Sequence, residues 1–255
     1  MNGIEIKDVT HVYGSGRESV KSLDDISISL PKGEFLTVLG PSGCGKSTLL
    51  RLVGGFLNPT SGRILVDGSE IEGPDIDRGI IFQDYALFPW KTVIENVAFG
   101  VHQTGTDKET ARKIAETQLD NVGLSGFENS YIKELSGGMK QRVSLARVLA
   151  YDPEYLLMDE PFGALDAQTR EVLQEDLLEI CSGTDKTILF ITHNIEEAAY
   201  LGDRMIMMTQ RPGRLKKSFE IDLDRTRNRN ELMASEAFTS VTTEAREAVR
   251  EEMTL

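Results

Sequence analysis

The stretch FLTVLGPSGCGKSTLLRLV (Phe35–Val53) decides the fold of this 255-residue chain. Its first five residues, Phe35–Leu39, form an unbroken apolar run that predicts a buried strand. A glycine-rich turn follows, and the segment after it predicts a helix. A strand that passes through glycines directly into a helix is the arrangement required by the motif G-x-x-x-x-G-K-[ST].

This motif predicts a loop that binds the phosphates of a nucleotide. Gly40, Gly43 and Gly45 let the backbone turn tightly and approach an anion without an intervening Cβ. The loop N–H groups and the helix N-terminus then face the phosphates, where Lys46 reaches the β- and γ-groups and Ser47 ligates Mg²⁺. The alternative is a glycine turn without a ligand. We expect the following loop residues at the nucleotide, Cys44 only as a tolerated small residue: Gly40, Pro41, Ser42, Gly43, Cys44, Gly45, Lys46, Ser47 and Thr48.

A second stretch, YLLMDEP (Tyr155–Pro161), supplies two carboxylates after an apolar strand. Ligands of α/β sheets bind at the carboxyl ends of the strands, which is where this pair lies. Adjacent residues of a strand point in opposite directions, so we expect two separate roles. Asp159 suits a Mg²⁺ contact, and Glu160 suits a general base that polarises the attacking water. A solvated surface pair is the alternative.

A third stretch, LSGGMKQR (Leu135–Arg142), predicts another helix that begins behind a glycine pair. Ser136 is a favourable N-cap, and the apolar pattern continues to Leu149. A second helix N-terminus of this kind can hold a phosphate, and it becomes useful if it closes on the nucleotide of another copy. The alternative is a simple helix cap.

The remaining pattern predicts an α/β fold. Alternating apolar residues at 4–6 and 26–30 favour half-buried antiparallel strands. Short apolar runs separated by helical segments favour a parallel sheet covered on both faces; they lie at 35–39, 80–82, 155–158, 188–191 and 205–208. Thr106 with Glu109 predicts a capping box before a helix. The tail from Arg225 predicts a mostly solvated surface helix without chemistry.

Composition excludes several functions. The formal net charge of −13 disfavours free binding to nucleic acid or anionic lipid. Two cysteines, Cys44 and Cys181, make neither a disulfide framework nor a metal cluster. The first ten residues lack a signal-peptide pattern, and no run of 18 apolar residues could span a membrane. Any membrane role must therefore come through a partner.

The order of the glycine loop, LSGGMKQR, LLMDEP and a later ITH resembles the ATP-binding subunits of ABC transporters over nearly the full chain. The resemblance implies a P-loop NTPase fold with a RecA-like parallel-sheet core, an N-terminal antiparallel β subdomain and an inserted α-helical subdomain. It implies one ABC ATPase domain over 1–255, with the core at 1–89 and 151–225, the helical subdomain at 90–150 and a C-terminal helical tail at 226–255.

The resemblance also implies roles for further residues. Tyr13 corresponds to an aromatic side chain that stacks on adenine, although a buried strand tyrosine is the alternative. Gln83 corresponds to a glutamine that contacts Mg²⁺ and water and reports to a membrane subunit. His193 corresponds to a histidine on the γ-phosphate. Asp166 corresponds to a loop aspartate at a dimer interface, with an ordinary helix N-cap as the alternative or additional role. The signature residues that contact the partner's γ-phosphate would be Ser136, Gly137 and Gly138.

The implied function is an ATP hydrolase whose cofactors are ATP and Mg²⁺. Two copies, or one copy and a homologous ATPase subunit, would sandwich two ATP molecules head to tail. Three stretches resemble the importers of nitrate, taurine, alkanesulfonate and bicarbonate: PDIDRGIIFQDYALFPWKTVIENV (Pro74–Val97), MDEPFGALDAQTR (Met158–Arg170) and RPGR (Arg211–Arg214). The implied partners are transmembrane permease subunits, docked at Pro89 and Trp90, and indirectly an extracytoplasmic substrate-binding protein, but no nucleic acid. We therefore expect a peripheral protein at the cytoplasmic face of the membrane.

Two alternatives stay open at this point. One is a soluble ABC ATPase without a transport role, such as one that assembles iron–sulfur clusters. The other is the ATPase of an exporter. The Phe88–Trp90 corner disfavours the first, and the importer-like motifs disfavour the second.

Overall fold

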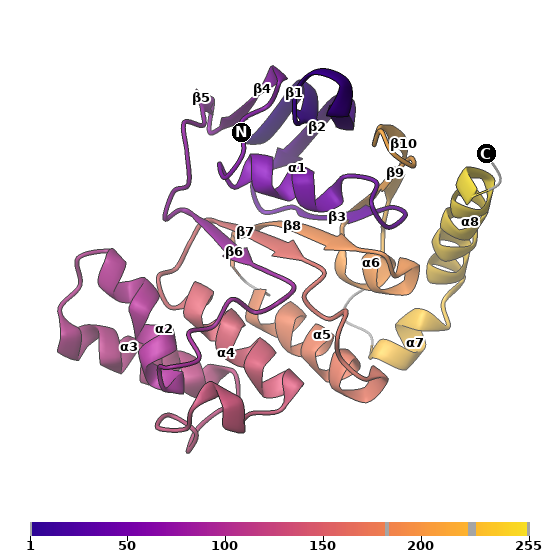
Figure 1. The fold of residues 1–255 in the computed structure, drawn as a ribbon. Helices are drawn as coiled ribbons and strands as arrows, with labels where there is room; N and C mark the ends of the chain where they lie inside the picture. Colours follow the sequence, from indigo (N-terminus) through magenta and orange to yellow (C-terminus); the bar gives the residue numbers. More distant parts are fainter. Residues whose placement is uncertain (1, 182–183, 224–227, 254–255) are drawn as a thin grey trace. The chain divides into compact units, whose positions relative to one another are not determined.

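The computed structural model describes residues 2–181, 184–223 and 228–253. Figure 1 shows the ribbon, coloured along the chain. The chain forms two compact units. The first combines Met1–Pro74 with Thr187–Leu255, and the second is Asp75–Lys186.

An antiparallel sheet in the first unit confirms the expected β subdomain. Its strands follow the order β2-β1-β4-β5. Ile4 pairs with Leu30 and Ile6 with Ile28, so the alternating residues meet on one buried face. The bounds of these strands are β1 Gly3–Tyr13, β2 Val20–Pro31, β4 Ser61–Val66 and β5 Ser69–Glu70.

The first unit also holds the strands that carry the glycine loop. β3 (Phe35–Leu39) pairs in parallel with β8 (Thr187–Thr192) on one side and β9 (Arg204–Met208) on the other. β10 (Leu215–Glu220) adds an antiparallel edge to β9. All five residues of β3 are buried, as its unbroken apolar run predicts. The helices that follow β3 and β8 are α1 (Lys46–Val53) and α6 (Ile195–Leu201).

The C-terminal helices are α7 (Arg229–Met233) and α8 (Glu236–Met253). Most described residues of this tail are exposed, as expected of a surface helix, but α8 also buries an apolar face that includes Ala245 and Ala248. These two alanines belong to a core cluster with residues of β3, α6, β9 and β10. Figure 1 shows α8 beside α6. The predicted start of the tail, Arg225, lies outside the described residues.

The second unit pairs β6 (Arg78–Ile81) with β7 (Tyr155–Asp159) in parallel and is otherwise helical. Gly79 of β6 lies so close to α4 that an added Cβ would be 2.4 Å from Val148 Cγ1. Glycine therefore permits the helix to pack directly on the strand. The helices of this unit are α2 Val93–Gln103, α3 Lys108–Asn121, α4 Gly137–Leu149 and α5 Ala167–Cys181. Short 3₁₀ turns occupy Gly16–Glu18 in the first unit and Ile132–Glu134 in the second.

The helix starts of the second unit differ in detail from the sequence expectation. The capping box predicted at Thr106 is wrong, because Asp107 is the N-cap of α3 and accepts from the N–H groups of Glu109 and Thr110. An aspartate satisfies these two donors one residue later than the expected start. The capping box instead lies at the start of α2, where Thr92 and Glu95 bond reciprocally.

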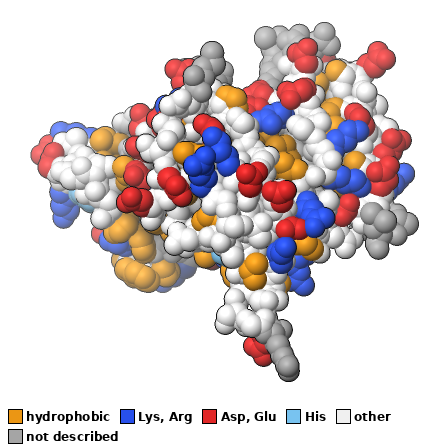
Figure 2. Space-filling view, turned by 90° about the horizontal axis from the view of Figure 1, so that it is seen from above, with side chains coloured by type: hydrophobic (Ala, Val, Ile, Leu, Met, Phe, Trp, Pro, Cys, Tyr) orange, Lys and Arg blue, Asp and Glu red, His pale blue; other side chains and the backbone are white. Residues whose placement is uncertain are grey.

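The surface charges are mixed. On the face drawn in Figure 2, Lys and Arg side chains are interspersed with Asp and Glu side chains over the described residues. The acidic excess of the sequence therefore does not form a single-sign surface on this face.

Candidate functional site

The glycine loop joins β3 to α1 as the motif requires. Gly43 and Gly45 have φ angles of +76° and +107°, a left-handed backbone that residues with a Cβ rarely adopt. At Gly45 a Cβ would also lie 2.7 Å from Leu23 Cδ2 and 2.8 Å from Ser22 O. At Gly43 it would meet no atom within 4 Å. Gly45 is therefore fixed by packing, whereas Gly43 lies at the open side of the loop.

Lys46 is held inside this loop. Its side chain is 5% exposed, and Nζ donates to the carbonyl oxygens of Gly40 at 2.8 Å and Pro41 at 3.1 Å. α1 begins at this lysine, and Gly45, its N-cap, has no side chain that could cap the helix. A buried ammonium beside the positive end of a helix fits a phosphate group.

Tyr13 lies next to the loop helix in the first unit. Its hydroxyl is 3.2 Å from Thr48 Oγ1, and its ring meets the His11 ring edge-on with centroids 4.6 Å apart. Tyr13 is 39% exposed, so the alternative of a buried strand tyrosine is wrong. An exposed aromatic ring beside a phosphate-binding loop fits a nucleobase platform.

His193 follows β8 at the same edge as the loop. Leu39 of β3 pairs with Thr192 of β8 in parallel, so Gly40 and His193 both follow directly at the carboxyl ends of neighbouring strands. The His193 side chain is exposed. The turn around it is fixed because Asn194 caps α6 by accepting from Glu197 N at 3.1 Å.

In the second unit, the two carboxylates lie at the carboxyl end of β7, Asp159 as its last residue and Glu160 directly after it. Asp159 is 6% exposed, whereas Glu160 is only partly buried. Glu160 has a φ of +44°, a left-handed conformation that is strained for a residue with a side chain. Ile81 of β6 pairs with Met158 of β7, so Gln83 emerges at the same edge as these carboxylates. The Gln83 side chain is exposed.

The LSGGMKQR stretch forms the start of α4 as predicted. Ser136 is the N-cap, and its Oγ accepts from Met139 N at 3.3 Å. Gly138 faces α5, where a Cβ would lie 2.5 Å from Thr169 Cγ2. Gly137 is exposed and has room, because its nearest neighbours to a Cβ are 3.5 Å or more away.

Asp166 lies beside the same helix pair. It accepts from Thr169 N at 3.1 Å and from Thr169 Oγ1 at 2.7 Å. Both bonds lower the pKa of the Asp166 carboxyl, and the bond from the Thr169 backbone N–H has the larger effect. The N-cap alternative for Asp166 is therefore correct within one chain, and the exposed carboxylate keeps the dimer-interface prediction open.

Arg147 is a residue that the sequence reasoning missed. From α4 its guanidinium donates to the carbonyls of Ala86 at 2.6 Å and Tyr85 at 2.9 Å, in the loop after Gln83. Tyr85 and Ala86 both have left-handed φ angles, +61° and +48°. Burial lowers the Arg147 pKa and raises that of the Tyr85 hydroxyl. Two consecutive left-handed residues are strained, so the surrounding structure must hold the loop in this conformation. Arg147 does so through its two hydrogen bonds to the loop carbonyls.

We expect Arg147→Lys to lower kcat for ATP hydrolysis by about tenfold while KM changes little, because a single, shorter-reaching ammonium does not reproduce the planar fork of two nitrogens that bonds Ala86 O and Tyr85 O, and the Gln83 loop shifts. Steady-state ATPase kinetics measures this. Arg112→Lys on the exposed face of α3 is the control and should match the unaltered protein. An Arg147→Lys variant with unchanged kcat would show that the loop is fixed without the guanidinium fork.

The predicted site residues are divided between the two units. The first holds the phosphate loop, Tyr13 and His193, and the second holds Gln83, the two carboxylates and the LSGGMKQR helix. A glycine loop between a buried strand and a helix, with a second apolar strand that ends in acidic residues, defines a P-loop nucleotide hydrolase.

Comparison with known proteins names the family. The chain belongs to the ABC transporter family, whose model matches residues 23–163. It is 50% identical to the taurine import ATP-binding protein of Roseobacter denitrificans over 222 residues, which are 87% of this chain and 83% of that protein. It is 48% identical to the nitrate import ATP-binding protein of Synechocystis over 220 residues, 86% of this chain and 83% of that protein.

Solved structures agree with the fold and the activity. A bacterial ABC transporter cassette solved as a dimer matches with a TM-score of 0.77 and 33% identity, over 86% of this chain and 99% of that chain. A post-hydrolysis dimer of such a cassette with ADP and Pi also matches, with a TM-score of 0.77 and 32% identity. The predicted P-loop fold is confirmed, and the chain is an ABC-type ATP hydrolase.

Proposed function

We propose that this chain is the ATPase subunit of an ABC importer for a small anionic or zwitterionic solute of the taurine or nitrate class. The observation that carries the proposal is about 50% identity to taurine import ATP-binding proteins over most of the chain. The two relatives named above are importer subunits, which favours an importer over the exporter and the iron–sulfur alternatives. The solute itself is selected by other subunits, so its class rests on the relatives.

Within the proposed site the loop residues hold the phosphates. Lys46 binds the β- and γ-phosphates, the N–H groups at the start of α1 bind their oxygens, and Tyr13 stacks on the adenine. The buried ammonium, the glycine at the open side of the loop and the exposed Tyr13 ring support this fit. The loop residues expected at the nucleotide are Gly40, Pro41, Ser42, Gly43, Cys44, Gly45, Lys46, Ser47 and Thr48.

Hydrolysis in this proposal depends on Glu160, Gln83 and His193. Glu160 accepts a proton from the attacking water, Gln83 orients that water, and His193 contacts the γ-phosphate. The donor set for Mg²⁺ is a hydroxyl, an amide and a buried carboxylate, from Ser47, Gln83 and Asp159, and it fits a hard cation that keeps several phosphate and water ligands. When bound there, the ion would neutralise charge on the phosphate oxygens.

The complete site needs a second copy of this chain or a homologous ATPase subunit. Ser136 and Gly137 are exposed at the start of α4, with the buried Gly138 next to them, and in the proposed dimer this helix start binds the γ-phosphate held by the partner. Asp166 lies beside it, at the proposed interface. Dimeric solved structures of similar cassettes support this arrangement. ATP then stabilises the closed dimer, and hydrolysis releases it.

The proposed contact with the permease is an aromatic corner at Phe88, Trp90 and Phe99. Trp90 is 71% exposed, and the Phe88 ring lies 5.7 Å from the Trp90 ring and 4.7 Å from the Phe99 ring, centroid to centroid. The buried Asn96 fixes the backbone beneath, because its Oδ1 accepts from Phe88 N at 2.8 Å. Rigid exposed aromatic clusters are typical of protein interfaces.

The proposed location is peripheral, at the cytoplasmic face of the membrane. In the described part of the chain, no helix combines the length and apolar character that a membrane span requires. Attachment would therefore run through the permease at the aromatic corner. An extracytoplasmic substrate-binding protein completes the proposed importer, and nucleic acid has no place in it.

We expect Trp90→Ser to leave the ATPase activity of the isolated subunit unchanged but to reduce permease binding by about tenfold or more, as loss of an interface hot spot does. Co-purification with the permease and uptake by the reconstituted complex measure this. Phe127→Ser, at another exposed aromatic residue of the same unit, is the control. Full permease binding by the Trp90 variant would contradict the docking role.

The solute class is tested in the reconstituted complex with its permease and binding protein. Inward transport of taurine, an alkanesulfonate, nitrate or bicarbonate, coupled to ATP hydrolysis, would support the proposal. Outward transport would favour the exporter alternative. Purification of the chain only in a complex without a multi-spanning membrane protein would contradict a transport role.

A further inference from the structure

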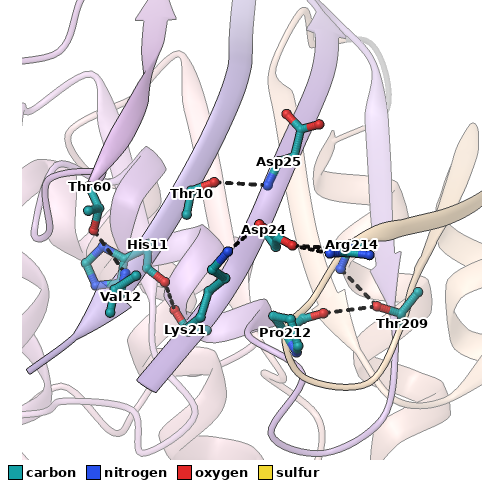
Figure 3. Close-up of polar contacts among 11 residues, drawn as sticks. Thr10, His11, Val12, Lys21, Asp24, Asp25, Thr60, Thr209, Pro212 and Arg214 are labelled. Carbon is teal, nitrogen blue, oxygen red and sulfur yellow. Dashed lines mark hydrogen bonds and ion pairs between the residues drawn. The ribbon is translucent and has the colours of Figure 1, made fainter. Parts of the chain in front are cut away.

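The turn Thr209–Arg214 between β9 and β10 has no part in the function proposed above. It closes on itself, because Thr209 N donates to Arg214 O at 2.9 Å, and Thr209 Oγ1 donates to Pro212 O and accepts from Arg214 N. Figure 3 shows this closed turn next to β2. The turn is therefore fixed by its own hydrogen bonds, and neighbouring segments can pack against it.

The phosphate loop packs on this turn at Gly213. A Cβ at Gly213 would lie only 2.1 Å from the Cys44 carbonyl oxygen. Cys44 is 1% exposed, and its Sγ would be 2.8 Å from a Cβ at Gly40. The Cys44 backbone is thus the buried contact between loop and turn, and its side chain lies against Gly40 within the loop. Only glycine at position 213 lets the turn approach the loop backbone this closely.

β2 joins the turn to the other side of the loop. Gly213 N donates to Ser22 O at 2.9 Å, and Asp24 N donates to Gly213 O at 3.0 Å. Ser22 also lies against Gly45, whose added Cβ would be 2.8 Å from Ser22 O. Arg214 forms an ion pair with Asp24, as Figure 3 shows. Gly213 and Gly45 therefore share one backbone neighbour, and a shift at one is passed to the other.

The far end of the turn is held by α8. Gln210 N donates to Glu252 Oε1 at 2.8 Å, and Gln210 Nε2 donates to Glu252 O at 3.0 Å. Glu252 is only 7% exposed and pairs with Lys216 at 3.3 Å. A buried carboxylate that accepts from a backbone N–H is costly to remove. The last helix of the chain thus reaches the phosphate loop through the turn.

We propose that Gly213 is a positioning residue for the phosphate loop. Through Gly213, the turn Thr209–Arg214 transmits the position of α8 to the loop and so sets the affinity of the loop for the triphosphate of ATP. The proposal rests on the phosphate-binding role proposed for the loop. It assigns a function to the C-terminal helix α8, which contacts the turn through Glu252.

The first test is Gly213→Ala, with ATP affinity measured by titration calorimetry on folded protein and the thermal midpoint measured beside it. We expect ATP affinity to fall about tenfold or more, because misplacing binding groups by roughly 1 Å is sufficient for such losses. Gly62→Ala is the control, since its Cβ would be 2.3 Å from Asp8 O in the antiparallel sheet, away from the loop. It should lose stability and keep ATP affinity. Equal ATP affinity of both variants would overturn the proposal.

A milder pair covers the case in which Gly213→Ala does not fold. Glu252→Ala and Glu251→Ala each remove one ion pair of Lys216, but only Glu252 holds Gln210. We expect Glu252→Ala to raise KM for ATP about threefold with kcat nearly unchanged, as loss of uniform binding does. Glu251→Ala should leave KM unchanged. The same KM in both variants would overturn the proposal.

Lys46→Ala distinguishes failure of the positioning role from failure of the proposed phosphate site. If ATP binding to the unaltered protein depends on Lys46 but not on Gly213 or Glu252, the positioning role is wrong and the proposed site stands. If ATP binding does not depend on Lys46, the proposed phosphate site itself is wrong.

Discussion

Glu160→Gln is expected to keep ATP binding and to lower kcat for hydrolysis by about 10²–10⁴-fold, the usual contribution of a general base. Glutamine has nearly the shape of glutamate but cannot accept the proton of the attacking water. Because ATP then persists, the variant should accumulate as a closed dimer in the presence of ATP. Single-turnover hydrolysis and size-exclusion chromatography with ATP measure the two effects.

The backbone around Glu160 explains why this substitution should leave the fold intact. Glu160 has the left-handed φ of +44°, and its carbonyl accepts from Gly163 N at 3.1 Å, so a local turn fixes the residue just after the buried β7. Glutamine preserves this backbone, so the variant should fold normally. Glu171→Gln on the exposed surface of α5 is the matched control and should hydrolyse ATP at the normal rate. Normal turnover in Glu160→Gln would remove Glu160 from the role of base.

The elements that could be predicted from the sequence are those whose signal is local. Phe35–Leu39 reads as a buried strand because every residue is apolar, and β3 has these bounds. Ser136 reads as an N-cap because its hydroxyl satisfies a donor three residues away. The signal that predicts the glycine loop lies in its own residues and in the strand and helix that flank it.

The elements that the sequence did not predict depend on residues distant along the chain. β10 is LKKSFE, and only Phe219 of the strand is fully buried, so its pattern is too polar to identify it as a strand. α8 appears solvated in composition, yet Glu252 is buried because Gln210 and Lys216 meet it there. In the sequence, nothing distinguishes Arg147 from other basic residues on helices. Its role becomes visible only in the structure, where it donates to the carbonyls of the strained residues Tyr85 and Ala86. A packing partner, once known, explains each case.

A division of each site between two copies predicts complementation. Lys46→Ala removes the ammonium from the phosphate loop but leaves the LSGGMKQR helix intact. Gly137→Asp leaves the phosphate loop intact but sets a negative charge where the partner's γ-phosphate is proposed to bind. Gly137 is exposed and has room for a side chain, and an acidic residue in the first turn favours the helix itself. Each variant alone should therefore fold and lose nearly all ATPase activity.

Mixing the two variants should restore activity. Half of the dimers would be mixed, and each mixed dimer has one of its two sites complete, so we expect up to roughly a quarter of normal turnover from C₂ pairing. The control is a chain that carries both Lys46→Ala and Gly137→Asp, mixed with Lys46→Ala, because no dimer of these two chains has a complete site and no activity should return. ATPase activity of the mixture against each variant alone measures the effect. A mixture no more active than the average of the two would mean that each chain hydrolyses ATP within a site of its own, since only a site shared between copies can be rebuilt from two different defects.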